Sequence, residues 1–131
     1  MALDRESWAK SWSCGQGATS GDVAAMYRDN GVRRDVNTNM VSEGPKGMTA
    51  FAEMFFAAVP DAVCVTRTWL QTGDTVAIEW TWSGTHTGDL EGWPATGKKF
   101  TLEGCNIAQL QDGLILDERS YWDWESLRSQ A

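Results

Sequence analysis

The sequence predicts an α+β domain in which helices from the first half of the chain pack on a curved, mostly antiparallel sheet from the second half. Apolar residues recur at helical spacing over residues 46–59, and after Pro60 the apolar period changes to two. The dipeptide Asp112-Gly113 separates two alternating segments and suits a two-residue hairpin turn. Helices followed by a series of antiparallel strands are the pattern of an α+β fold.

The first third of the chain is helical in pattern. Asp4 can cap a helix that runs to Trp12, and the glycine-containing segment 15–21 ends it. Ser20 or Asp22 then begins a short second helix. Both helices carry the apolar residues they need to pack on a sheet.

A short edge strand is expected over residues 30–36, before a turn at residues 37–39. The third helix follows over residues 46–59, where Met48 and Phe55 belong to the apolar stripe, and Pro60 ends it.

The second half predicts four strands, because its segments are rich in β-branched and aromatic residues that alternate with polar ones. They are expected at residues 63–70, 75–87, 100–111 and 114–122, with a turn at Gly73-Asp74 and a loop at 88–97. The tail, residues 123–131, is expected to be a frayed helical turn.

Size and charge limit the classes of function. A chain of 131 residues fits one domain with one core, so residues 1–131 are expected to form a single unit. The net charge of −7 repels phosphate backbones and anionic lipid, which argues against a nucleic-acid partner. The longest apolar run, residues 54–59, is far below the roughly 20 residues that span a bilayer. A cytoplasmic protein without membrane contact is expected.

Motifs for metals and nucleotide cofactors are missing from the sequence. The three cysteines form no CxxC pair, and the single histidine rules out a histidine-rich metal site. No phosphate-binding loop or dinucleotide fingerprint occurs. Any catalysis is therefore expected to need neither a metal nor a cofactor.

Several short motifs follow one another from Gly44 to the C-terminus. They are Gly44-Pro45-Lys46-Gly47, Pro60-Asp61, Gly73-Asp74, Trp80, Gly84-Thr85-His86-Thr87-Gly88, Pro94-Ala95-Thr96-Gly97-Lys98, Asp112-Gly113 and Asp123. In this order the chain resembles the SnoaL-like polyketide cyclases of the nuclear-transport-factor-2-like superfamily. The resemblance implies a cone-shaped, cystatin-like fold around an apolar pocket. That fold hosts cyclases, isomerases, dehydratases, epoxide hydrolases and non-catalytic binding modules.

The resemblance also implies where chemistry takes place, since cyclases of this family pair a carboxylate on the last strand with a histidine on the preceding strand. The corresponding positions here read Asn106 and Glu118-Arg119-Ser120. The family's acid–base pair is therefore altered, and the resemblance carries over the fold more firmly than the reaction.

Three residues are candidates for proton transfer: Glu118, His86 and Asp123. His86 is the single imidazole, and its ordinary pKa near 6.5 suits proton transfer at neutral pH. Its place in the family motif also indicates a second role, in which it orders the loop that follows. A carboxylate buried in an apolar cone takes the raised pKa that acid–base chemistry uses.

One face of the last strand must line the cavity. Strict alternation puts Asp117, Arg119, Tyr121 and Asp123 on one face and Leu116, Glu118, Ser120 and Trp122 on the other. A solvated pair of Asp117 and Arg119 on the outer face makes Glu118 the inward acid. The candidate ligand-binding residues are Trp80, Trp82, Asn106, Ser120 and Trp122. The first two tryptophans fit plain core packing equally well.

Three functions remain open. The first is a cofactor-independent cyclase, isomerase or dehydratase that moves a proton on a small carbonyl or polycyclic compound. The second is a non-catalytic module that binds an apolar small molecule. The third is water addition to an epoxide, for which Asp117, Arg119 and Asp123 are the compact group of charges. A homodimer is also expected, because helices cover one face of the sheet and leave an aromatic-rich face exposed.

Overall fold

A computed structural model describes residues 3–90 and 92–131. The elements in chain order are α1 (Arg5–Ser11), the 3-10 turn η1 (Cys14–Gln16), α2 (Ser20–Ala24), β1 (Tyr27–Asp35), β2 (Met40–Glu43), α3 (Gly44–Ala58), β3 (Val63–Thr72), β4 (Thr75–Thr85), β5 (Lys99–Gln111), β6 (Leu114–Trp122) and α4 (Trp124–Gln130).

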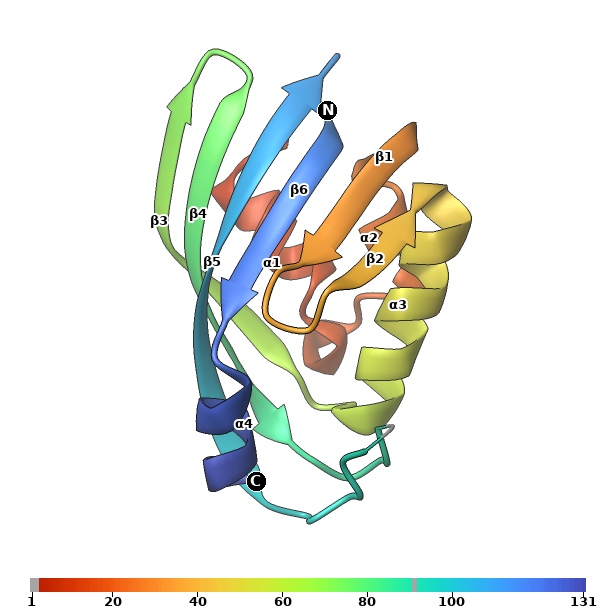
Figure 1. Cartoon of the computed structure of the whole chain (residues 1–131), viewed down its shortest axis with the longest axis vertical. Coiled ribbons are helices and arrows are strands. Elements are labelled where there is room, and N and C mark those ends of the chain that lie inside the picture. Colours follow the sequence, from red (N-terminus) through yellow and green to blue (C-terminus); the bar gives the residue numbers. More distant parts are fainter. Residues whose placement is uncertain (1–2, 91) are drawn as a thin grey trace.

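The six strands form one sheet in the order β2-β1-β6-β5-β4-β3. The pairs β3–β4, β4–β5, β5–β6 and β1–β2 are antiparallel, and β1 runs parallel to β6. Helices α1, α2 and α3 cover one face of the curved sheet, while α4 and the segments 86–90 and 92–98 lie at one end of it (Figure 1). The predicted α+β fold is confirmed.

The N-terminal helices begin at polar caps. Asp4 accepts hydrogen bonds from the backbone N–H groups of Glu6 and Ser7, so the predicted cap of the first helix is confirmed. The second helix begins at Ser20, one of the two predicted starts, and its N-cap is Thr19. Asp22 completes that cap by accepting from the Thr19 N–H.

The first strand differs most from the prediction. An edge strand was expected at residues 30–36, but β1 starts at Tyr27 and lies inside the sheet between β2 and β6. The predicted turn is present and leads into β2, which the sequence did not predict. Because β2 has four residues and is mostly exposed, it carries too little alternation to be seen in the sequence.

The predicted meander is confirmed with two changes. β4 ends at Thr85, two residues early, because the N–H groups of Thr87 and Gly88 turn away from β5 and bond the Ala58 carbonyl at the end of α3. In β6 the register shifts beside Leu116, so that Ile115, and not Leu116, is fully buried on the inner side. This bulge corrects the strict alternation assumed for the last strand.

The C-terminal segment is an ordered helix and not a frayed turn. Leu127 of α4 is fully buried. The side chain of Gln130 bonds both the backbone N–H and the backbone carbonyl of Thr101 on β5, each at 2.9 Å. These contacts hold α4 against the end of the sheet. None of the described helices is long and apolar enough to cross a membrane.

Candidate functional site

A cavity of about 60 Å³ lies between the helices and the inner face of the sheet. Its apolar wall consists mainly of aromatic rings, seven in all. A cysteine and a leucine of the sheet and a leucine of α4 complete the wall. The apolar lining residues are Trp8, Trp12, Phe51, Phe55, Cys64, Trp80, Trp82, Leu102, Trp122 and Leu127. Three charged or amide side chains, Arg33, Asp35 and Asn106, interrupt this wall. The cavity is therefore an aromatic chamber with one polar corner.

The polar corner is built on β1. Arg33 and Asp35 stand two residues apart, so both side chains point to the inner face of the strand. Nη2 of Arg33 lies 3.0 Å from Oδ1 of Asp35, and Nε lies 3.4 Å from Oδ2. The guanidinium also lies over the rings of Trp12 and Phe51, 5.1 and 4.9 Å from their centroids. Arg33 is thus fixed in position on several sides.

Glu118 on β6 also binds the guanidinium of Arg33. Its Oε1 lies 3.1 Å from Nη1 of Arg33 and also accepts from the Tyr27 hydroxyl. Its Oε2 accepts from Nδ2 of Asn106 at 3.2 Å. Glu118 is fully buried but does not line the cavity. Its contacts indicate that it orients Arg33 and Asn106, the residues that do line it.

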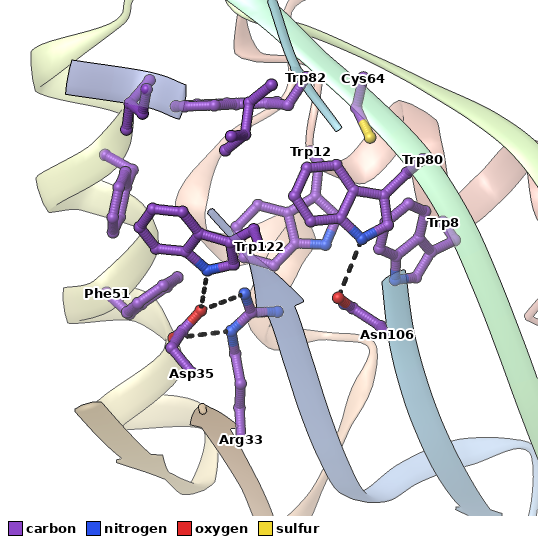
Figure 2. A pocket seen from close by; sticks show the side chains of 13 residues that line it. Trp8, Trp12, Arg33, Asp35, Phe51, Cys64, Trp80, Trp82, Asn106 and Trp122 are labelled. Atoms are coloured by element: carbon purple, nitrogen blue, oxygen red, sulfur yellow. Dashed lines mark hydrogen bonds and ion pairs between the residues drawn. The ribbon is translucent and has the colours of Figure 1, made fainter. Parts of the chain in front are cut away.

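Two indole N–H groups fix the polar side chains of the cavity wall. Nε1 of Trp122 donates to Oδ1 of Asp35 at 2.9 Å, and Nε1 of Trp80 donates to Oδ1 of Asn106 at 2.9 Å (Figure 2). Among the described residues, Oδ2 of Asp35 receives only the 3.4 Å bond from Arg33. Oε2 of Glu118 likewise receives one bond, from Asn106 at 3.2 Å, but Glu118 does not line the cavity, so Oδ2 of Asp35 is the carboxylate oxygen that can accept a proton or hydrogen bond from a ligand there.

Charges in the cluster do not balance. One guanidinium faces two carboxylates, and all three side chains are at least nine-tenths buried. Burial by itself lowers the pKa of Arg33, but the neighbouring Asp35 and Glu118 outweigh it and raise this pKa above its ordinary value. Burial, and next the charge of Glu118, raise the pKa of the Tyr27 hydroxyl well above its ordinary value. Arg33 therefore stays charged and Tyr27 stays protonated.

Cys64 is the thiol of the cavity wall. Burial raises the pKa of this thiol to about 12, so it is protonated at neutral pH and acts as a small apolar side chain. Among the described residues, no group of three or more histidine, cysteine, aspartate or glutamate side chains is arranged to hold a metal ion.

Most of the residues expected from the sequence come together around this cluster. Glu118, Asn106 and Ser120 are buried on the inner face, as the face assignment predicted. Trp80, Trp82 and Trp122 line the cavity, whereas Ser120 does not. The Ser120 hydroxyl has no hydrogen-bond partner among the described residues.

His86 and Asp123 lie elsewhere. The His86 ring is buried and stacks on Trp93 with 3.5 Å between ring centroids, and it does not line the cavity. Because Trp93 belongs to the loop, this stacking favours a role of the ring in ordering the loop, and the backbone carbonyl at the same position accepts from the N–H groups of Thr96 and Gly97. Asp123 is exposed and caps α4 by accepting from the Glu125 N–H. The structure does not bring either side chain to the cluster.

The charges proposed for epoxide hydrolysis lie on the outer face. Asp117 and Arg119 form a partly exposed pair at 3.0 Å, as the alternative reading of that face predicted. Together with the exposed Asp123, they are separated from the cavity by the strand that carries them. They cannot surround a water molecule inside the cone.

Tyr27, Arg33 and Asp35 are the functional residues that the sequence did not single out. All three lie on β1, which was predicted only in part. A usable signal was present, since opposite charges two residues apart on a strand share one face and can pair there. From the sequence alone, such a pair is interpreted as lying on the protein surface, unless the strand is known to lie inside the sheet with that face covered.

The comparisons with known proteins agree with this architecture. The family description "SnoaL-like polyketide cyclase" matches residues 7–131. Aklanonic acid methyl ester cyclase DnrD of Streptomyces peucetius is 42% identical over 41 residues, which are 31% of this chain and 28% of the relative. Aklanonic acid methyl ester cyclase DauD of Streptomyces sp. (strain C5) matches to the same extent, over 26% of its length. The sequence match thus spans under a third of either relative.

Solved structures show the same fold at low sequence identity. TsrD from Streptomyces laurentii superimposes with a TM-score of 0.82 at 22% identity, over 98% of this chain and 96% of TsrD. A protein of ketosteroid isomerase-like fold from Catenulispora acidiphila DSM 44928, in complex with trimethylamine, gives a TM-score of 0.82 at 16% identity, over 95% and 88% of the two chains. With the family match over residues 7–131, the chain belongs to the SnoaL-like polyketide cyclase family and has the nuclear-transport-factor-2-like fold.

Proposed function

We propose that this protein is a cofactor-independent enzyme that removes a proton next to a carbonyl group, with Asp35 as the base. The single observation that carries the proposal is the position of Oδ2 of Asp35. It belongs to a carboxylate that lines an apolar cavity, and only a 3.4 Å bond from Arg33 occupies it. A positioned carboxylate within reach of a carbon acid is what general base catalysis requires.

Arg33 and Asn106 are suited to stabilise the oxygen on which negative charge develops. Both line the cavity together with Asp35. Each keeps N–H groups beyond those used in the bonds to Asp35 and Glu118. Donors held in place within an apolar chamber stabilise an enolate without reorganising, because Glu118, Tyr27 and Trp80 already fix them.

Charge accounting favours this step. When Asp35 takes a proton from carbon, the negative charge passes from the carboxylate to the oxygen of the substrate. The net charge of the buried cluster stays the same, so no charge has to enter or leave the apolar cavity. The enolate can then attack a second carbonyl group, which is cyclisation, or be protonated at another carbon, which is isomerisation.

Glu118 has a different role in this scheme from the one expected from the sequence. Tyr27, Arg33 and Asn106 all donate to it, and it does not line the cavity, so a ligand there would meet Arg33 and Asn106 first. We assign it to positioning. His86 orders the loop, and Asp123 caps α4.

Hydrogen–deuterium exchange tests the proposal without knowledge of the natural substrate. A panel of ketones from hydroxyacetone to the bicyclic 4-chromanone is incubated with the protein in D₂O, and loss of the α-proton signal is followed by NMR. Exchange of at least one ketone is expected to be faster with the wild-type chain than in D₂O without protein. Asp35→Asn should lower the rate with protein roughly 100-fold or more. Asp117→Asn, on the outer face, is the matched control and should keep the wild-type rate.

If ketones bind but no member of the panel exchanges, the protein is a binding module and the proposed reaction is wrong. A wild-type exchange rate in Asp35→Asn would move the base to another residue.

A further inference from the structure

The cavity is small and rich in hydrogen-bond donors, and these two properties restrict the size and the polar groups of a ligand that fits it. We infer that it takes a small aliphatic carbonyl compound with two oxygen acceptors, and not a polycyclic one. The inference rests on the proposed function, since it names the substrate class of the same site.

Size is the first reason. The cavity measures about 60 Å³, whereas an apolar cavity of roughly 150 Å³ holds one benzene ring. The protein's own rings take up the space: Trp82 packs against Phe55 and Phe100 at 5.9 and 5.6 Å between centroids. On the other side Trp12 packs edge-on against Phe51. Because each ring contacts others, several must move together before a fused ring system can enter.

Unpaired donors are the second reason. The indole N–H groups of Trp8, Trp12 and Trp82 have no hydrogen-bond partner among the described residues, although their side chains are at least nine-tenths buried. All three rings line the cavity. The nitrogens of Trp8 and Trp12 lie on the side of their rings that faces Asn106 and Arg33 (Figure 2). Buried N–H groups are costly without an acceptor, so a ligand that supplies one gains affinity here.

Acceptors are scarce in the same corner. Asp35 supplies the one carboxylate of the cavity wall, and its Oδ1 already accepts from Arg33 and Trp122. A ligand whose polar groups are donors would therefore find few partners. Two oxygens suit the arrangement, since one can meet Arg33 and Asn106 while the other meets the indole N–H of Trp12 or Trp8.

Indole signals in ¹H–¹⁵N NMR spectra test the donor part directly. Two probes of equal non-hydrogen atom count are titrated: hydroxyacetone, with two oxygens, and butanone, with one. Hydroxyacetone should shift the Trp8 or Trp12 indole signal and bind about five-fold tighter, as one added hydrogen bond of ordinary strength predicts. Trp8→Phe and Trp12→Phe assign the signals. Equal affinity for both probes, with no indole shift, would overturn this part.

Competition with 4-chromanone tests the size part. It also carries two oxygen acceptors, a carbonyl and an ether oxygen, but on a fused ring system, and the wild-type chain should bind it at least about ten-fold more weakly than hydroxyacetone. Phe55→Ala removes a half-buried ring of the wall and should reverse this order. Leu127→Ala, on α4, is a second variant that widens the cavity if the first fails to fold. Binding of 4-chromanone to the wild type as tightly as hydroxyacetone would overturn the size limit.

These outcomes are separable from the proposed reaction. If the protein exchanges the α-protons of 4-chromanone as fast as those of hydroxyacetone, the proposed reaction is supported and the inferred substrate class is wrong. If the protein binds hydroxyacetone tightly but exchanges the α-protons of no ketone, the inferred ligand class is supported and the proposed reaction is wrong.

Discussion

Trp122 and Asp35 are joined by a hydrogen bond of 2.9 Å from the indole Nε1 to Oδ1 of the carboxylate. The bond connects the end of β6 to the end of β1. It occupies the oxygen that Arg33 also holds and leaves Oδ2 as the atom available to a ligand. The orientation of the proposed base therefore depends on an indole.

Replacing Trp122 by phenylalanine keeps a ring and removes this donor. Since a hydrogen bond to a buried charge contributes roughly 1.5–3 kcal/mol, the free energy of unfolding should fall by about 2 kcal/mol. Ketone exchange should fall as well. The matched control is Trp124→Phe, because Trp124 packs edge-on against Trp122 but does not line the cavity. Denaturant unfolding measures the free energy of unfolding of both variants. Equal losses of this free energy would show that the indole ring, and not its N–H group, stabilises the protein.

Gly104 is the cross-strand partner of Trp80 on one side and of Trp122 on the other. A Cβ atom at this position would overlap the six-membered ring of Trp80. Gly104→Ala should therefore displace the indole, break its bond to Asn106 and destabilise the chain by about 1–3 kcal/mol. Gly21→Ala is the control, because α2 has room for a methyl group there and should be unchanged or stabilised. Thermal unfolding measures both, and a neutral Gly104→Ala would contradict the tight packing of Trp80.

The sequence predicted the helices, the meander and the inner face of β6, because long periodic segments record burial directly. Glu118, Ser120 and Trp122 were placed inside on this ground, whereas Asn106 was identified from the family resemblance. The sequence did not predict the centre of the site, since Arg33 and Asp35 are charged residues that pair only through the tertiary fold. Their strand is central because β2, a short and weakly patterned segment, occupies the sheet edge. The bulge at Leu116 is likewise a product of pairing between strands and not of local pattern.

Burial lowers the pKa of His86 below its ordinary value of about 6.5, so the folded state favours the neutral ring. Between the lowered pKa and about 6.5 the unfolded chain binds more protons, and stability falls as the pH falls through this window. The melting temperature of the wild type should therefore drop more than that of His86→Gln between about pH 7 and pH 5. Parallel curves for the two proteins would show that His86 does not titrate differently on folding.

The sequence led us to expect an aromatic-rich exposed face, but Trp80, Trp82 and Trp122 line the cavity instead. The outer face of the sheet exposes Val65 and Tyr121, at 41% and 43%. Burial of apolar surface between two copies would account for them, so a dimer is predicted at micromolar concentration. Tyr121→Asp should shift the sedimentation coefficient towards the monomer. Met40→Asp, which changes an exposed residue of the edge strand β2, is the control. A wild-type chain that sediments as a monomer at every concentration would contradict the prediction.

The most direct test of the central claim compares Asp35→Asn with Glu118→Gln in the same ketone exchange measurement. Asp35 lines the cavity, whereas Glu118 does not and instead bonds Arg33 and Asn106, which do. Asp35→Asn should lower exchange roughly 100-fold or more in the folded protein, and because it too breaks a buried ion pair with Arg33, its free energy of unfolding should fall by about 3 kcal/mol. Glu118→Gln should weaken binding and stability, by about 3 kcal/mol for a broken buried ion pair, yet retain measurable exchange in the folded protein. Loss of exchange in Glu118→Gln together with a wild-type rate in Asp35→Asn would contradict the account.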